Sequence, residues 1–155
     1  MSSPLPSFSS GRTLRRSAGE LLARVVAAAG LAYDAYAHFD LAGNFDANSA
    51  VISQGMLFRV DAVFAALAAL LVLITRRWVV AIFAVLVAGS ALGAVLLYRY
   101  VDLGVLGPLP NMYEPGWYPE KTLSAIAEAA AILAAAALLF LPRWRISGSH
   151  PADAG

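Results

Sequence analysis

Cysteine is missing from this chain, and histidine occurs only twice. The lack of cysteine excludes disulfides, thiolate metal sites, iron–sulfur clusters and cysteine nucleophiles. No Glu-x-x-His pair occurs, so neither a di-iron bundle nor a bis-histidine haem is expected. Nucleophile-elbow, P-loop and GxGxxG motifs are also missing, and nothing indicates nucleic-acid binding. We therefore expect a protein that is not an enzyme and has no catalytic residues and no cofactor.

Charge is scarce as well. Charged residues make up 14% of the 155 residues and hydrophobic ones 60%, whereas soluble domains average about 25% and 45–50%. A soluble domain of this size cannot bury so much apolar surface, so lipid must solvate much of it. The apolar runs predict an all-α integral membrane four-helix bundle over residues 16–142, with a disordered tail at 1–15 and a cytoplasmic tail at 143–155. The expected helices span residues 18–39, 53–75, 78–99 and 121–141.

Basic residues predict the orientation of the bundle, because cytoplasmic loops of membrane proteins are enriched in Lys and Arg. Eight of the eleven basic residues fall on one side: Arg12, Arg15, Arg16, Arg24, Arg76, Arg77, Arg143 and Arg145. Both termini are therefore expected in the cytoplasm (N-in, C-in), in a multi-pass protein of a bacterial plasma membrane. One alternative is that the first apolar run is a signal peptide, since Ala35-Tyr36-Ala37 has the form of a cleavage site.

Acidic residues gather on the opposite, outer half of the bundle. The same predicted topology places eight of the ten acidic residues there, together with three of the basic ones. Asp34, Asp61 and Glu128 lie five or six residues inside their predicted helices, which is roughly 8–9 Å below the outer edge. Carboxylates at one depth in three helices are costly in lipid, so we expect them to face the bundle interior. His38 shares a helix face with Asp34, four residues away.

This predicted outer cluster, Asp34, His38, Asp61 and Glu128, has three interpretations. The first is an internal salt-bridge network that fixes helix packing. The second is a polar chamber that holds an ion, a proton or a small ligand. In both, the basic partners are Arg59, Arg99 and Lys121. The third is a metal site of one nitrogen and several oxygens. We assign no metal here, because a lone His beside an Asp is more often a hydrogen-bonded structural pair.

Three local patterns suggest helix packing, an ion pair and turn chemistry. Gly89-x-x-x-Gly93 favours a close helix contact within the bundle over homodimerisation. Glu20 and Arg24, four residues apart, are expected to pair with each other near the membrane interface. Asn44-x-Asp46-x-Asn48 lacks the glycine and glutamate of an EF-hand loop, which leaves Asx-turn chemistry as the better interpretation.

The segment between the third and fourth helices is rich in proline and aromatic residues. Tyr113, Trp117 and Tyr118 give it an apolar side that favours the membrane interface. The segment is a lid over the cluster, an anchor in the lipid headgroups, or a surface on which a protein partner docks.

This loop, together with ISQGMLFRVDA before the second helix and EKTLSAIAEAA entering the fourth, resembles a group of small four-helix bacterial membrane proteins. The resemblance covers roughly residues 18–141 and implies the topology, without an activity. The chain is also loosely similar to DoxX-like four-helix proteins in size, helix count and polar residues near helix ends. That similarity transfers no function.

The sequence thus favours a non-enzymatic membrane accessory or scaffold protein whose acidic, aromatic outer face docks a partner or ligand. Its expected partners are the lipid bilayer and a membrane protein or a second copy of the chain. The alternative is a small transporter, or an ion- or proton-binding protein, that uses the outer cluster.

Overall fold

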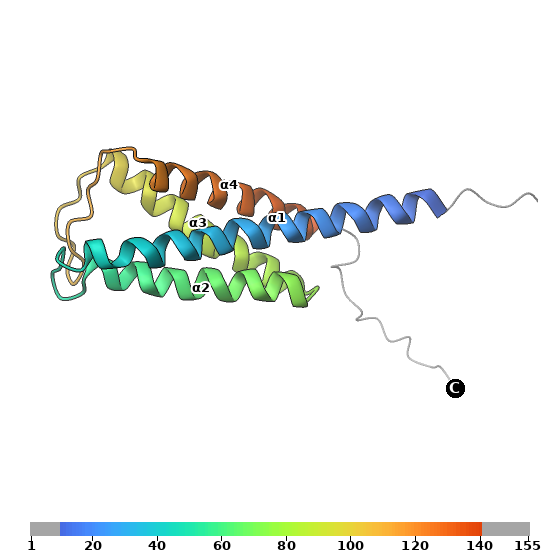
Figure 1. Cartoon of the computed structure of the whole chain (residues 1–155), viewed down its shortest axis with the longest axis horizontal. Helices are drawn as coiled ribbons and strands as arrows, with labels where there is room; N and C mark the ends of the chain where they lie inside the picture. Colours follow the sequence, from blue (N-terminus) through green and yellow to red (C-terminus); the bar gives the residue numbers. More distant parts are fainter. Residues whose placement is uncertain (1–9, 141–155) are drawn as a thin grey trace, which may run out of the picture.

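The computed structural model describes residues 10–140, with side chains from residue 18 onward, and this part of the chain is helical without a β-strand. Its elements follow the chain in a simple up-and-down order (Figure 1). They are α1 (Ser10–Ala42), the 3-10 turn η1 (Gly43–Phe45), α2 (Gln54–Ile74), α3 (Trp78–Tyr100) and α4 (Pro119–Phe140). The predicted four-helix, all-α architecture is confirmed.

Helix α1 is the element whose length differs most from expectation. It begins at Ser10, within the stretch for which a disordered tail was predicted, and it projects beyond the ends of the other helices (Figure 1). The remainder of the predicted N-terminal tail and the whole of the C-terminal one, including His150, lie outside the described residues. Helix α2 begins where Ser53 accepts a hydrogen bond from the Met56 amide, at 3.0 Å, which satisfies an otherwise unpaired donor of the first turn.

Helices α2, α3 and α4 are long and apolar enough to cross a membrane. Helix α1 is more polar, yet the polar side chains within its described part are largely turned inward: Glu20, Arg24 and Asp34 are each less than a tenth exposed. Its outward side carries apolar residues such as Leu21, which is 62% exposed. A soluble helix shows the reverse pattern, so the outer surface of α1 is suited to lipid as well.

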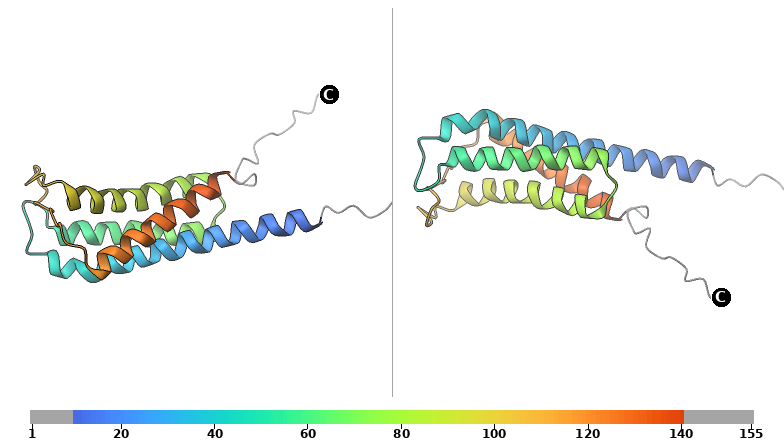
Figure 2. Two further views of the ribbon diagram at one scale, coloured as in Figure 1. Left: turned by 90° about the horizontal axis from the view of Figure 1, so that it is seen from above. Right: turned by 90° about the horizontal axis from the view of Figure 1, so that it is seen from below.

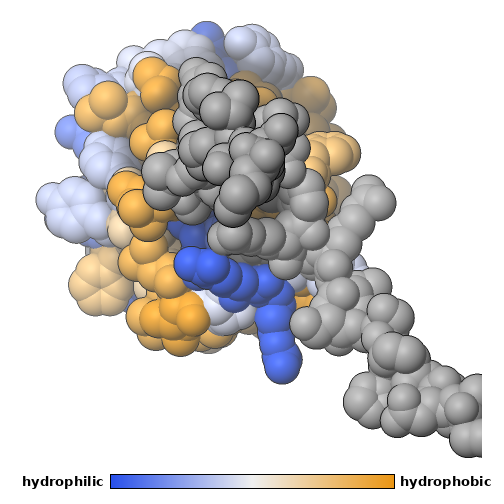
Figure 3. Space-filling view, turned by 90° about the vertical axis from the view of Figure 1, so that its right-hand side faces the viewer, coloured by the Kyte–Doolittle hydropathy of each residue, from blue (hydrophilic) through white to orange (hydrophobic). Residues whose placement is uncertain are grey.

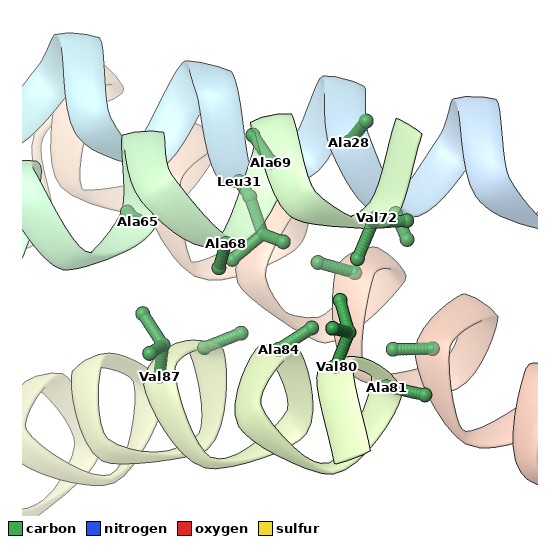
Figure 4. Packing of buried hydrophobic residues seen from close by; sticks show 14 of the residues in the cluster. Ala28, Leu31, Ala65, Ala68, Ala69, Val72, Val80, Ala81, Ala84 and Val87 are labelled. Carbon is green, nitrogen blue, oxygen red and sulfur yellow. The ribbon is translucent and has the colours of Figure 1, made fainter. Parts of the chain in front are cut away.

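The core between the helices is made mainly of alanine. Ala65, Ala68 and Ala84 are fully buried there, and Figure 4 shows them beside Leu31 and Val72, which point between the helices. The larger apolar side chains lie on the outside instead, among them Val63, Leu86, Ile126, Leu133 and Phe140. Small residues inside and large ones outside are typical of helices that pack in lipid, where close backbone approach replaces the hydrophobic effect as the source of stability.

A close helix approach joins α1 to α4. Helix α4 runs obliquely, from beside α1 at its start to beside the start of α3 (Figure 2), and it contacts both. A Cβ added to Gly30 would lie 2.5 Å from the Ala127 carbonyl oxygen, so only glycine fits there. The expected close packing through Gly89 and Gly93 is wrong: neither has a neighbour within 4 Å of such a Cβ, because the buried face of α3 is lined by other residues.

The bundle has two different ends, which we name by what they contain. The terminus end holds the beginning of the described part of α1 and the short 75–77 link, and hydrophilic side chains lie there beside apolar ones (Figure 3). The loop end holds the 43–53 and 101–118 segments. These two segments are joined, because the amides of Val51 and Ile52 both donate to the Pro108 carbonyl, at 3.2 and 3.0 Å.

Candidate functional site

Four polar side chains from three helices meet inside the bundle on its loop-end half, and we call them the carboxylate–imidazole cluster: Asp34 and His38 of α1, Asp61 of α2 and Glu128 of α4. His38 Nδ1 lies 2.7 Å from Asp34 Oδ1 and 3.5 Å from Asp61 Oδ2. Ligand atoms of Asp34, His38 and Glu128 all lie within 4.8 Å of one another. The expectation that Asp34, Asp61 and Glu128 face one interior is therefore met in the structure.

Glu128 joins the cluster through a serine. The Ser124 hydroxyl donates to Glu128 Oε1 at 2.7 Å and lies 3.4 Å from Asp34 Oδ1. Asp34 and Glu128 are both fully buried, at 0% exposure. Each nevertheless has one oxygen, Asp34 Oδ2 and Glu128 Oε2, without a hydrogen-bond partner. Buried polar atoms are nearly always paired, so these two carboxylate oxygens are positions where a proton, a water molecule or an ion would fit.

The His38 ring is held in one orientation. Its Nδ1 faces two oxygens of Asp34, the carboxylate at 2.7 Å and the backbone carbonyl at 3.1 Å, as well as Asp61. Oxygen acceptors on all sides mean that Nδ1 carries the hydrogen. The ring of Phe58 meets the imidazole edge-on, with centroids 5.1 Å apart, and fixes its plane.

A chamber of about 250 Å³ lies between the cluster and the loop-end segments. His38, Asp61 and Ser124 line it on the cluster side, whereas Glu114 and Tyr118 line it from the loop. Most of the remaining wall is apolar and comes from α1, α2 and α3. The chamber is therefore a mainly apolar space with polar groups gathered at its ends, which is the usual composition of a binding pocket.

Two of the three predicted basic partners lie away from the cluster. Arg59 forms a two-pronged ion pair with Asp46, both bonds at 2.7 Å, and so pairs outside the cluster that it was expected to join. This guanidinium holds the pKa of the Asp46 carboxyl below its usual range. Arg99 stacks instead on Trp117 and Tyr100, with its guanidinium carbon 5.9 and 5.2 Å from the ring centroids.

Lys121 does reach the chamber, but it is held by the loop. Its ammonium donates to the Glu114 and Gly116 carbonyls, at 2.5 and 3.2 Å, and lies 5.6 Å from the Trp117 ring centroid. The three aromatic residues predicted to dock a partner differ in their exposure. Tyr113 and Trp117 are exposed, whereas Tyr118 lines the chamber. Burial raises the pKa of the Tyr118 hydroxyl, with Glu114 and Glu120 adding to the effect, so Tyr118 is a hydrogen-bond donor at neutral pH.

Several chamber residues have no counterpart in the sequence prediction. Ser124 is four residues before Glu128, and this helical spacing could have identified it. Gln54 and Glu114 also line the chamber. Glu114 is brought there by its backbone, whose amide donates to the Tyr98 carbonyl at 3.0 Å. No local signal in the sequence indicates that bond.

Fold and site together define a class: an α-helical bundle with three helices able to cross a membrane and a buried carboxylate–imidazole cluster beneath a chamber. Comparison with protein families, curated proteins and solved structures gives no match for this chain. The resemblance to small four-helix bacterial membrane proteins, and the looser similarity to DoxX-like proteins, stay predictions.

Proposed function

We propose that this chain is a multi-pass membrane protein that binds a cation in the carboxylate–imidazole cluster, reached through the chamber. The observation that carries the proposal is the charge of the cluster. Three carboxyl groups and one imidazole are in contact, and within the described residues no Lys or Arg forms an ion pair with them. With its carboxylates ionised, the cluster has a negative excess even when His38 is charged, and a buried net charge is expensive unless a counter-ion balances it.

The depth of the cluster makes this imbalance more costly. Counted from the loop-end termini of their helices, Asp61, Asp34 and Glu128 lie seven, eight and nine residues in. At about 1.5 Å per residue, that is roughly 10–14 Å, deeper than the sequence suggested because the helices extend further. The outer half of a hydrocarbon core of about 30 Å contains this level.

Packing toward the terminus end favours binding over conduction. Beyond the cluster the bundle is filled by Ala27, Leu31, Ala68, Val72 and Leu138, all of which are fully buried. A cation that enters from the chamber thus meets a closed apolar core. We assign no catalytic step to this site.

We place the loop end outside a bacterial plasma membrane, with the N- and C-termini in the cytoplasm. The support is the excess of arginine at the terminus end, including Arg76 and Arg77, which are exposed in the 75–77 link. The loop end carries most of the acidic residues. This charge difference matches the positive-inside rule.

Thermal unfolding of the full chain in mild detergent tests the proposal. The buffer is supplemented in turn with Na⁺, K⁺, Mg²⁺, Ca²⁺, Zn²⁺, Mn²⁺ and tetramethylammonium. At least one of these cations should raise the midpoint in a concentration-dependent way, by the equivalent of about 2.7 kcal/mol at a hundred times its Kd. Glu128→Gln should remove the response, whereas Glu120→Gln, an exposed carboxylate at the start of α4, should retain it. A chain that no cation stabilises would contradict the proposal.

The accessory or scaffold function is the second candidate, and a specific contact favours it. The exposed Trp117 ring lies within cation–π distance of both the Arg99 guanidinium and the Lys121 ammonium. Tyr113 of the same loop is exposed as well, and exposed aromatic side chains are of the type that proteins use as an anchor. Native mass spectrometry of the protein extracted from its own membrane distinguishes the two. A stable heteromer that is lost in Trp117→Ala supports docking, and a lone chain carrying a bound ion does not.

A further inference from the structure

We propose that the cation is a divalent transition metal, bound by Asp34, His38 and Glu128, with Asp61 as the fourth ligand. This inference rests on the proposed cation-binding function and narrows it to one chemical class. It uses four side chains that the sequence alone had not assigned to a metal.

The spacing of the donor atoms suits a single small ion. Nitrogen and oxygen ligands lie about 2.0–2.2 Å from zinc, so two ligands of a tetrahedral site are roughly 3.4 Å apart. The separations of His38 Nδ1 from Asp34 Oδ1 and Asp61 Oδ2 are 2.7 and 3.5 Å, on either side of that value. A ligand atom of Glu128 lies within 4.8 Å of those of Asp34 and His38. A small inward movement of the Glu128 carboxylate would therefore bring it to the spacing of a tetrahedral site.

The two unpaired oxygens are independent evidence that a ligand is needed. Asp34 Oδ2 and Glu128 Oε2 are buried on side chains with 0% exposure, and neither has a partner. Asp61 Oδ2 has no hydrogen-bond partner either and faces His38. A structural network would be expected to satisfy these atoms, whereas a metal ion satisfies carboxylate oxygens from three helices at once.

The imidazole decides the class of metal. Mg²⁺ and Ca²⁺ prefer ligand sets made entirely of oxygen, whereas imidazole suits zinc and other transition metals. Nδ1 of His38 carries a hydrogen that is surrounded by carboxylate oxygens, and a metal ion takes the place of that hydrogen.

Ser124 acts as a positioning residue. Its hydroxyl holds Glu128 Oε1 at 2.7 Å, which leaves Oε2 free on the same carboxylate. Such supporting hydrogen bonds orient a ligand, and their loss typically weakens metal binding about 10–100-fold. The chamber supplies the entry path, since His38, Asp61 and Ser124 all line it.

Isothermal titration of the full chain in mild detergent, stripped with a chelator and titrated with ZnCl₂, MnCl₂ or MgCl₂, tests the inference. We expect one zinc per chain, weaker binding of manganese, as the general order of metal affinities requires, and no heat from magnesium. Glu128→Gln and His38→Ala should abolish zinc binding, and Ser124→Ala should weaken it roughly tenfold. Asp46→Asn, whose carboxylate pairs with Arg59 outside the cluster, should bind like the wild type.

Two outcomes overturn the inference, and they differ in what they mean for the proposed function. If zinc and manganese fail to bind while another cation stabilises the chain in a Glu128-dependent way, the metal assignment is wrong and cation binding stands. If no cation binds or stabilises, both fall. Size-exclusion elution and helical circular dichroism of each variant establish that a lost response is not a lost fold. Zinc binding that survives in folded Glu128→Gln and His38→Ala also overturns the assignment.

Discussion

Helix α1 buries polar side chains toward both ends of the bundle, and the two sites differ in how their charge is balanced. Toward the terminus end, Arg24 donates to the carbonyls of Val72, Leu73 and Thr75, at 2.9, 2.8 and 2.8 Å. These carbonyls belong to the last turn and cap of α2, where intrahelical partners run out. Toward the loop end, Asp34 meets further carboxylates and keeps an unpaired oxygen. At the first site, the charge of Arg24 is used in hydrogen bonds that hold α1 against α2. At the second site, negative charge is left over that a ligand could balance.

The terminus-end site also has a counter-ion. Glu20 is buried, and its Oε1, which accepts no hydrogen bond, lies 3.4 Å from Arg76 Nε in the link that follows α2. The expected pair of Glu20 with Arg24 along one helix is replaced by contacts across helices, because Arg24 is turned toward the end of α2. Charge of both signs is therefore present at this end, whereas the carboxylate–imidazole cluster has an excess of one sign.

Replacing Arg24 should have the largest effect on stability. Arg24→Ala leaves three carbonyls of α2 without a buried donor and should lower the free energy of unfolding by roughly 3–5 kcal/mol. Asp34→Asn removes charge from a site that already has an excess of it, so in the absence of added cations it should lower the free energy of unfolding less than Arg24→Ala does. Reversible unfolding in mixed micelles with increasing sodium dodecyl sulfate measures both. Equal losses would show that the two sites have the same structural role.

Disturbing the contact of α1 with α4 should have the second-largest effect on stability. Gly30→Leu places a side chain against the Ala127 carbonyl and should cost about 1–3 kcal/mol, because the two backbones must separate. Since this contact lies between the two buried polar sites and helps hold Asp34 near Glu128, the variant should also lose the cation response. Gly93→Leu is the matched control, as open space surrounds that position. A stability loss in the control as large as that of Gly30→Leu would argue for an interface on α3 that a single chain does not show.

The exposed pair of Asp46 and Arg59 should contribute least. Because Arg59 lowers the pKa of Asp46 in the folded chain, the stabilisation is complete at pH values above the ordinary pKa of aspartate, about 4, and is lost as pH falls through the lowered value. Thermal unfolding of Asp46→Asn beside the wild type should show a small difference at pH 7 that disappears in strong acid. A difference that persists in acid would mean that Asp46 stabilises the loop end through contacts other than its charge.

The helical spans were predictable from sequence because hydropathy is a property of one segment at a time. The predicted and observed ends of α2, α3 and α4 differ by at most two residues. The start of α1 was not predictable in this way, because its first residues are polar and no apolar run extends to Ser10. The level of Asp34, Asp61 and Glu128 followed from counting residues along each helix, and the three do meet.

What sequence alone determined about this protein is the pattern along each helix: which stretch is apolar, which residues of different helices lie at one level, and where charge is scarce. The tertiary structure decided the partners. It turned Arg24 toward the end of α2, paired Arg59 with Asp46, placed a close approach at Gly30 rather than at Gly89 and Gly93, and brought Ser124 of α4 beside Asp34 of α1. Partner choice depends on how far each helix is rotated about its axis and on the angle at which helices cross. Both are set by packing among all four helices together.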